Sequence, residues 1–390
     1  MSELKTMLDR ALEGFEPASD GLEQTMARVQ RRRRRRRATV RATGVLVVVA
    51  SVVAAFILIP GHGGGQITTK PATPVRPPSI QAVTTLPVAG GLTDITVGDG
   101  SLWVPGNGVV HRLDPSTGHN VADIPVPGAS DRRYAAFGAG GVWITDTGTQ
   151  QVTRIDPSTN GVVATISLNV EPNGIHVLSG AVWVSYSRAT STAGSADTGV
   201  VVIDPNTNQP GTPIQFSQHG ATEIAVGDGH VWVSDGTLVA YDAGQQLATP
   251  VRLPRAYPGL QLVAAGDRAL WFISLSGTPG ANGSRTIPVR INTTKITSPT
   301  FSPVARRIPI PQAVEVAVTD NAIWVLTNRS DQTGNRPGQL WELDPSTLQI
   351  VGRPITVGTT PVRLLATPDT VWVANYSEST ITSVGLRPGR

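Results

Sequence analysis

Five polar residues share one position in a repeated sequence pattern, nine residues before a tryptophan. They are Asp94, Tyr134, Glu223, Glu315 and Arg363, and two further repeats place Gly174 and Leu262 there. Three carboxylates, a phenol and a guanidinium that converge could bind a cation, an amine or another polar ligand. The alternative is that these positions line a wet opening, where polar side chains are tolerated without binding anything. The choice depends on the fold that positions them.

The repeat itself is defined by seven of the eight tryptophans, which are 39 to 53 residues apart. They are Trp103, Trp143, Trp183, Trp232, Trp271, Trp324 and Trp372. Each ends a phrase such as VGDGSLWVP, in which an apolar stretch and a tight turn precede the aromatic residue. One tryptophan per repeat at a fixed register favours packing between repeats over a carbohydrate or cation cage.

A second phrase, Asp-Pro-Ser-Thr or Asp-Pro-Asn-Thr, follows at Asp114, Asp156, Asp204 and Asp344. The proline presets the turn, and the Asp side chain can accept N–H groups within it. Each unit therefore reads as four short strands. Seven such units predict an all-β fold, a seven-bladed β-propeller over residues 79–390.

The two ends of this region predict how the ring closes. The last repeat contains only three strands, at residues 364–366, 371–374 and 380–384. Residues 82–88 resemble the fourth strand of the first repeat, residues 121–126. We therefore expect an N-terminal strand to complete the last blade, which removes open sheet edges without disulfides.

Residues 1–78 have a different character. Residues 42–59 form an apolar run that as a helix would span about 27 Å, near the thickness of a bilayer core. Seven consecutive arginines at 31–37 precede it and should hold the N-terminal side in the cytoplasm. We predict a short helical cytoplasmic segment (1–41), a transmembrane helix (42–60), a Pro/Gly-rich linker (61–78) and an extracytoplasmic propeller.

A cleaved signal peptide is the rival interpretation of this N-terminal part. Its positively charged region would have to exceed 40 residues, and no clean small-x-small site follows the apolar run. The uncleaved anchor is therefore favoured. Residues 1–30 carry two short amphipathic stripes, separated by Pro17, that could dock a cytoplasmic partner.

Charge and composition exclude several classes. The formal net charge is +4, but residues 1–60 carry +5 and residues 61–390 carry −1, so the large domain is not predicted to bind nucleic acid. The arginine run could bind nucleic acid or anionic lipid, although its place beside the apolar run favours a topological role. The chain has no Cys, which excludes disulfides, cysteine zinc sites and thiol nucleophiles. No cofactor is expected.

The repeats resemble YVTN-type and virginiamycin B lyase-like seven-bladed propellers. The Asp-Pro-Ser-Thr turns and the phrase Val-Ala-Asn-Tyr-Ser-Glu-Ser-Thr-Ile at 373–381 carry the resemblance. In the lyase-like members a catalytic His lies just ahead of the first strand. The matching positions here hold no His: Thr93, Arg133, Asn173, Thr222, Gln261, Val314 and Val362. The nearby His176 and His219 do not match that pattern, so no catalytic or metal-ligating residue is assigned.

Two main functions follow. The first is a membrane-anchored binding module, a sensor or scaffold, that takes an extracytoplasmic protein, peptide or envelope ligand at the five polar positions. The second is a lyase- or hydrolase-type enzyme that uses the acidic funnel with a divalent metal. A third, in which the N-terminal segment acts as in anti-sigma regulators, lacks the His/Cys zinc motif common in that group. Longer second-to-third-strand connections, at 187–198, 276–285 and 328–337, are expected on the same face as the five polar positions.

Overall fold

The computed structural model describes the propeller region with internal gaps. The described residues are 79–88, 92–128, 130, 132–189, 196–217, 223–227, 230–234, 237–242, 245–246, 251–252, 260–266, 268–276, 285–292, 305–328 and 336–387. The predicted cytoplasmic segment, transmembrane helix and linker lie outside them. Every regular element in the described ranges is a β-strand, so these ranges contain no helix with the length and apolarity to cross a bilayer.

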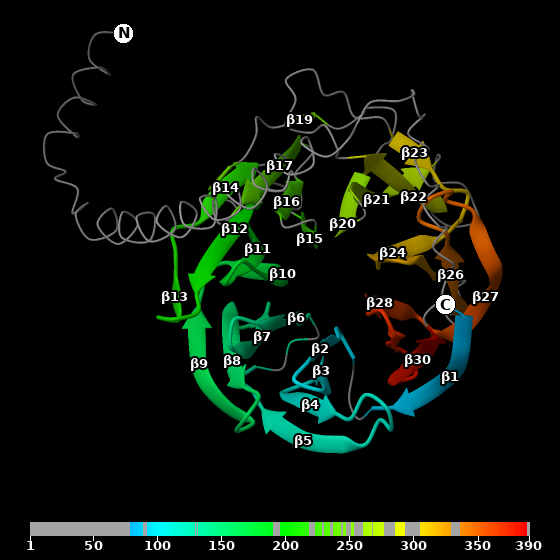
Figure 1. Ribbon diagram of the computed structural model, residues 1–390. Helices are drawn as coiled ribbons and strands as arrows, with labels where there is room; N and C mark the ends of the chain where they lie inside the picture. Colours follow the sequence, from blue (N-terminus) through cyan, green and yellow to red (C-terminus); the bar gives the residue numbers. More distant parts are fainter. Residues whose placement is uncertain are drawn as a thin grey trace, which may run out of the picture. The chain divides into compact units, whose positions relative to one another are not determined.

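The described strands pair into seven sheets that follow one another around a ring (Figure 1). Six sheets are built from strands consecutive in the chain, and the seventh is composite. This arrangement is a β-propeller, and each sheet is a blade.

The first sheet contains β2 (Thr96–Gly98), β3 (Ser101–Pro105), β4 (Val109–Leu113) and β5 (Asn120–Pro125). The second contains β6 (Ala135–Gly138), β7 (Gly141–Asp146), β8 (Gln151–Asp156) and β9 (Gly161–Ser167). The third contains β10 (Glu171–Leu178), β11 (Ala181–Ala189), β12 (Ala196–Asp204), β13 (Gln209–Pro210) and β14 (Ile214–Ser217). The fourth sheet contains β15 (Glu223–Gly227), β16 (His230–Ser234), β17 (Thr237–Asp242), β18 (Gln245–Gln246) and β19 (Val251–Arg252). The fifth contains β20 (Leu260–Gly266), β21 (Ala269–Ser276), β22 (Arg285–Asn292) and β23 (Ala305–Arg307). The sixth contains β24 (Ala313–Val318), β25 (Ile323–Thr327), β26 (Pro337–Leu343) and β27 (Ile350–Thr359).

The composite sheet closes the ring. It contains β28 (Pro361–Ala366), β29 (Thr370–Asn375) and β30 (Thr380–Arg387), and β1 (Ser79–Pro87) as its outer strand. β1 pairs antiparallel with β30 from Ser79 opposite Arg387 to Pro87 opposite Thr380. The predicted closing strand is thereby confirmed, with a start three residues earlier than the sequence pattern indicated.

The tryptophans pack between neighbouring sheets. All seven lie on the second strand of a sheet and are at most 3% exposed. Trp143 of β7 belongs to a core cluster with Val182 and Val184 of β11. Trp103 packs in the same way with residues of the following sheet, and so does Trp324. Inter-blade packing, and not a solvent-facing cage, is therefore their role.

Arginines opposite two of these tryptophans extend the contact to the next sheet. The guanidinium carbon of Arg112 lies 4.7 Å from the Trp103 ring centre, and its Nη1 donates to Pro157 O and, at 2.9 Å, to Asn160 Oδ1. Arg154 stacks on Trp143 at 4.8 Å and donates in the same way to Pro205 O at 2.6 Å and Asn208 Oδ1 at 2.8 Å. The Asp-Pro turns at Asp156 and Asp204 thus each receive an arginine from the preceding sheet.

The turns themselves form as the sequence predicted. Asp114 Oδ1 accepts the N–H groups of Ser116 and Thr117, both at 2.9 Å. Hydrogen bonds from the Ser116 hydroxyl and from these N–H groups lower the pKa of Asp114 to about 2. Asp344 makes the same pair of contacts, at 2.8 Å each.

We expect Trp143→Ala to lower the free energy of unfolding by about 3–5 kcal/mol, because it leaves a cavity between two sheets. Urea unfolding, followed by tryptophan fluorescence and circular dichroism, measures the loss. The matched control is Val163→Ala on β9, because Val163 is 52% exposed. This substitution should change the free energy of unfolding by less than about 0.5 kcal/mol. A loss below about 1 kcal/mol in Trp143→Ala would contradict the packing role.

Candidate functional site

The positions nine residues before each tryptophan all lie at the start of the innermost strand of a sheet. Asp94 precedes β2 and Tyr134 precedes β6, whereas Glu223 begins β15. Glu315 lies in β24 and Arg363 in β28, while Gly174 and Leu262 fall in β10 and β20. These seven strands surround the axis of the ring (Figure 1). The side chain of Glu223 is outside the described part of the structure.

Four of the five predicted side chains converge, and we call them the hub cluster: Asp94, Tyr134, Glu315 and Arg363. Arg363 Nε lies 3.0 Å from Asp94 Oδ1, and its Nη1 lies 3.3 Å from Glu315 Oε1. Its guanidinium carbon lies 5.0 Å from the centre of the Tyr134 ring. One arginine thus connects residues from four sheets.

Both carboxylates of the hub cluster also accept backbone N–H groups from the next sheet. Asp94 Oδ2 accepts the N–H of Ala135 at 2.9 Å, and Glu315 Oε2 accepts the N–H of Leu364 at 2.6 Å. In each case the donor is the residue after the equivalent hub position. Asp94 Oδ1 additionally accepts the N–H of Ile95 at 2.9 Å. The acids therefore join sheets as well as facing the axis.

A β-bulge precedes two of the hub residues, Glu315 and Arg363, and sets the direction of their side chains. The register of β24 on β25 shifts between Ala313 and Glu315, and that of β28 on β29 shifts between Pro361 and Arg363. A bulge of this kind inserts one unpaired residue and turns the following side chain. Glu315 and Arg363 thereby meet across adjacent strands, a geometry that regular alternation along the strands does not predict.

Burial and mutual charge set the protonation of the cluster. Burial raises the pKa of Glu315 to about 7, and the nearby Asp94 charge adds to this, while Arg363 and the Leu364 N–H oppose it. Burial also raises the pKa of Asp94, against the lowering effects of Arg363 and two N–H groups. Burial opposes the charged form of Arg363, but Asp94 and Glu315 outweigh it and raise its pKa. The cluster therefore holds one firm cation and one carboxyl that titrates near neutrality.

His176 lies on the same side of the ring axis but was not among the predicted site residues. It follows Gly174 by two positions in β10, so its side chain projects from the same face of the strand that Gly174 occupies. Burial and the positive charge of Arg363 lower the pKa of His176 to about 4. The imidazole is consequently neutral at physiological pH. In the sequence, His176 does not match the position of the catalytic His in the lyase-like propellers, so that pattern did not indicate it.

A second residue that the sequence did not single out is Arg133, which is 1% exposed. Its Nη2 lies 2.7 Å from Asp146 Oδ2, and it donates to Gly106 O at 3.2 Å and Pro127 O at 2.9 Å. This buried pair fixes the connection from the first sheet to the second, directly before Tyr134. Its role is to hold the hub residue that follows it.

The three longer connections between second and third strands begin on the face of the ring that the sequence predicted, the face of the hub cluster. Glu171 pairs with Ser187, Leu260 with Ser274 and Ala313 with Thr327, so these connections leave on the hub side of their sheets. The third-sheet connection is shorter than predicted, because Ser187 and Thr198 still pair within the hairpin. The central parts of the three connections lie outside the described residues.

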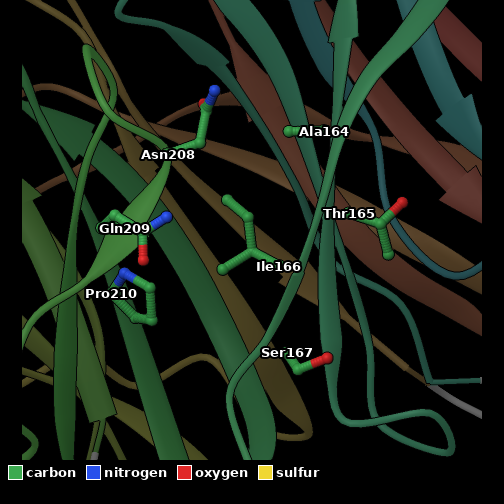
Figure 2. A pocket seen from close by; sticks show the side chains of 7 residues that line it. All are labelled: Ala164, Thr165, Ile166, Ser167, Asn208, Gln209 and Pro210. Atoms are coloured by element: carbon green, nitrogen blue, oxygen red, sulfur yellow. The ribbon is translucent and has the colours of Figure 1, made fainter.

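A surface cavity of about 400 Å³ is lined by none of the hub residues (Figure 2). Residues 164–167 of β9 form one wall, and residues 208–210 at the turn into β13 form the other. Neither wall carries a titratable side chain. Nor do the described residues contain a group of three or more His, Asp or Glu side chains placed to hold a metal ion. The hub cluster is therefore the site with the most chemistry in the described ranges.

Comparison with known proteins gives the class of the fold. No family model and no curated protein matches the chain. A structure of hydrazine synthase from Kuenenia stuttgartiensis aligns with a TM-score of 0.59 at 15% identity, over 84% of this chain and 100% of that one. The WD40 domain of Pan2 from Neurospora crassa aligns at 0.53 and 12% identity, over 77% of this chain and 90% of the other. At these identities the likeness shows the fold alone, which is a β-propeller.

We expect Glu315→Gln to change how stability depends on pH. The folded pKa of Glu315, about 7, exceeds its ordinary value of 4.5, so the folded state binds this proton more tightly than the unfolded state. The resulting stabilisation is complete below pH 4.5 and is lost as the pH rises through 7. Between pH 5 and pH 8, wild type should therefore lose up to about 3 kcal/mol relative to Glu315→Gln.

Urea unfolding of both proteins across that pH range measures the difference. His176 titrates in the opposite direction, because its pKa is lowered, but it is present in both proteins and cancels. Parallel stability curves for the two proteins would show that Glu315 does not titrate as described.

Proposed function

We propose that this protein is a single-pass membrane protein whose extracytoplasmic propeller is a non-enzymatic binding module. Its ligand is an envelope molecule, a peptide or a protein that engages the hub cluster. The observation that carries the proposal is the meeting of Asp94, Glu315 and Arg363 from three sheets, over the Tyr134 ring of a fourth. A polar cluster built from several sheets at the axis, with Arg363 29% exposed, can be reached by a ligand.

The membrane anchor rests on the sequence. Residues 42–60 have the length and apolarity of a bilayer span, and the arginines at 31–37 favour a cytoplasmic N-terminus. The chain enters the propeller at Ser79, the end of β1 that pairs with Arg387. That end of β1 is opposite the end near the hub cluster, where Pro87 pairs with Thr380.

The alternative function, a metal-assisted enzyme, is less well supported than the binding module, because the carboxylates that would bind the metal are already engaged. Arg363 and backbone N–H groups already engage both described carboxylates. A divalent metal at these oxygens would have to displace the guanidinium and face its positive charge. The YVTN-type and lyase-like resemblance accordingly describes the architecture, and its catalytic His has no counterpart here.

Affinity purification of the full-length protein from washed membranes tests the proposal. Wild type is compared with Tyr134→Phe/Arg363→Lys, which keeps the charge and most of the volume of the hub cluster. Arg112→Lys is the matched control, because Arg112 also joins two sheets but lies at the Asp-Pro turns. Thermal unfolding checks that all three proteins fold.

The expected result is a species, identified by mass spectrometry, that co-purifies with wild type and Arg112→Lys but is reduced at least tenfold with the double variant. Recovery of the protein in the soluble fraction would contradict the anchor. Identical catches from all three proteins would contradict binding at the hub cluster.

A further inference from the structure

We propose that the hub cluster binds the carboxylate group of its ligand through Arg363 Nη2 and the Tyr134 hydroxyl, and that Glu315 takes up a proton from solvent when it does. This inference rests on the proposed function and specifies the chemistry of the ligand. The ligand class is an organic acid or a peptide that presents a free carboxylate to the axis of the ring.

The hydrogen-bond inventory shows which groups of the cluster remain open. A guanidinium carries five N–H donors, and Arg363 directs Nε to Asp94 and Nη1 to Glu315. Its Nη2 contacts no other group in the described part of the chain. The Tyr134 backbone N–H donates to Thr145 Oγ1 and its ring lies against the guanidinium, while its hydroxyl makes no hydrogen bond within the described part of the chain. The open groups of Arg363 and Tyr134 are therefore hydrogen-bond donors.

The acceptors of the cluster, in contrast, are already engaged. Asp94 accepts from Arg363 and from two N–H groups, and Glu315 accepts from Arg363 and Leu364. The Arg363 side chain is 29% exposed, whereas those of Asp94 and Glu315 are 12% and 16% exposed. A ligand that approaches along the axis thus meets donors first. An arginine N–H edge and a phenol together suit a carboxylate.

The charge balance links this binding to a proton. With Asp94 and Glu315 both ionised, the two acids and Arg363 together carry a net charge of −1, which repels an anion. With Glu315 protonated and Asp94 ionised, the net charge of the same three groups is zero. His176, which lies near enough to Arg363 to be affected by its charge, does not change this count at neutral pH, because burial and that charge lower its pKa to about 4.

In the free protein, Glu315 gains or loses its proton near physiological pH, because burial raises its pKa to about 7. A bound carboxylate raises that pKa further, since it adds a negative charge beside the acid. Affinity should therefore be about tenfold weaker at pH 8 than at pH 6. A cationic ligand, which would use the ionised acids, requires the opposite pH dependence.

Isothermal titration calorimetry on the full-length protein in detergent tests the inference with three probes. They are N-acetylalanine, its neutral amide, and alaninamide as the cationic counterpart. We expect N-acetylalanine to bind at least tenfold more tightly than either other probe. At pH 7, titrations in buffers of different ionisation enthalpy should show uptake of about half a proton, because Glu315 is half protonated beforehand.

Variants separate the roles of the residues. Tyr134→Phe and Arg363→Lys should each weaken N-acetylalanine binding at least fivefold, and Arg112→Lys should leave it unchanged. Glu315→Gln should keep binding but abolish both the pH dependence and the proton uptake. That outcome distinguishes proton linkage from a merely structural role for Glu315.

Three results would overturn the inference: equal binding of the acid and its amide, preference for alaninamide, or wild-type binding that does not weaken between pH 6 and pH 8. Each leaves the proposed function standing if the membrane-purified partner still depends on the hub cluster. Conversely, the calorimetry could show carboxylate binding while the membrane-purified partner is recovered equally with wild type and the hub variants. That result would support the inference and contradict the proposed function.

Discussion

The pairing of β1 with β30 is the contact on which the rest of the structure depends. Each sheet packs its tryptophan against the following sheet, so an open row would leave one apolar face without a partner at each end. The β1–β30 ladder completes the last sheet, and Trp372 then packs with Leu102 and Leu113 of the first. The hub cluster straddles this joint, because Arg363 belongs to the composite sheet and Asp94 precedes the first. Closure therefore places the cation between its two acids.

The repeat period made much of this arrangement predictable. The fixed distance from each tryptophan identified the innermost strand and the side of the ring on which its first residues lie. Four of the five predicted side chains meet there, because residues at one register in successive sheets must converge at the axis. The partial repeat at the C-terminus predicted the closing strand for the same reason. These inferences needed only periodicity and the need to bury sheet edges.

The contacts within the site were not predictable from periodicity. The bulges before Glu315 and Arg363 break the alternation of β24 and β28, and no residue type at Val314 or Val362 announces them. The N–H groups accepted by Asp94 and Glu315 belong to other sheets. The Arg133–Asp146 pair joins residues whose separation depends on how two sheets pack. Such features arise from the relation between repeats, whereas the sequence pattern describes only one repeat at a time.

The arginines on Trp103 and Trp143 give the ring a direction. Each reaches forward to the Asp-Pro turn of the next sheet and never backward. In the language of oligomers, this is a heterologous interface: one surface of a unit meets a different surface of its neighbour, and the series ends only when the rotation closes. The single chain is thus a cyclic assembly whose subunits are covalently joined. At β26 the partner of Trp324 is Glu342 in place of an arginine, and its Oε1 has no hydrogen-bond partner. The residues opposite Trp183, Trp232 and Trp372, which are Val202, Ala240 and Ser383, supply no arginine either. At the interface that leads into the composite sheet, Trp324 shares an apolar cluster with Leu364 and Val371, and Arg363 pairs with Glu315.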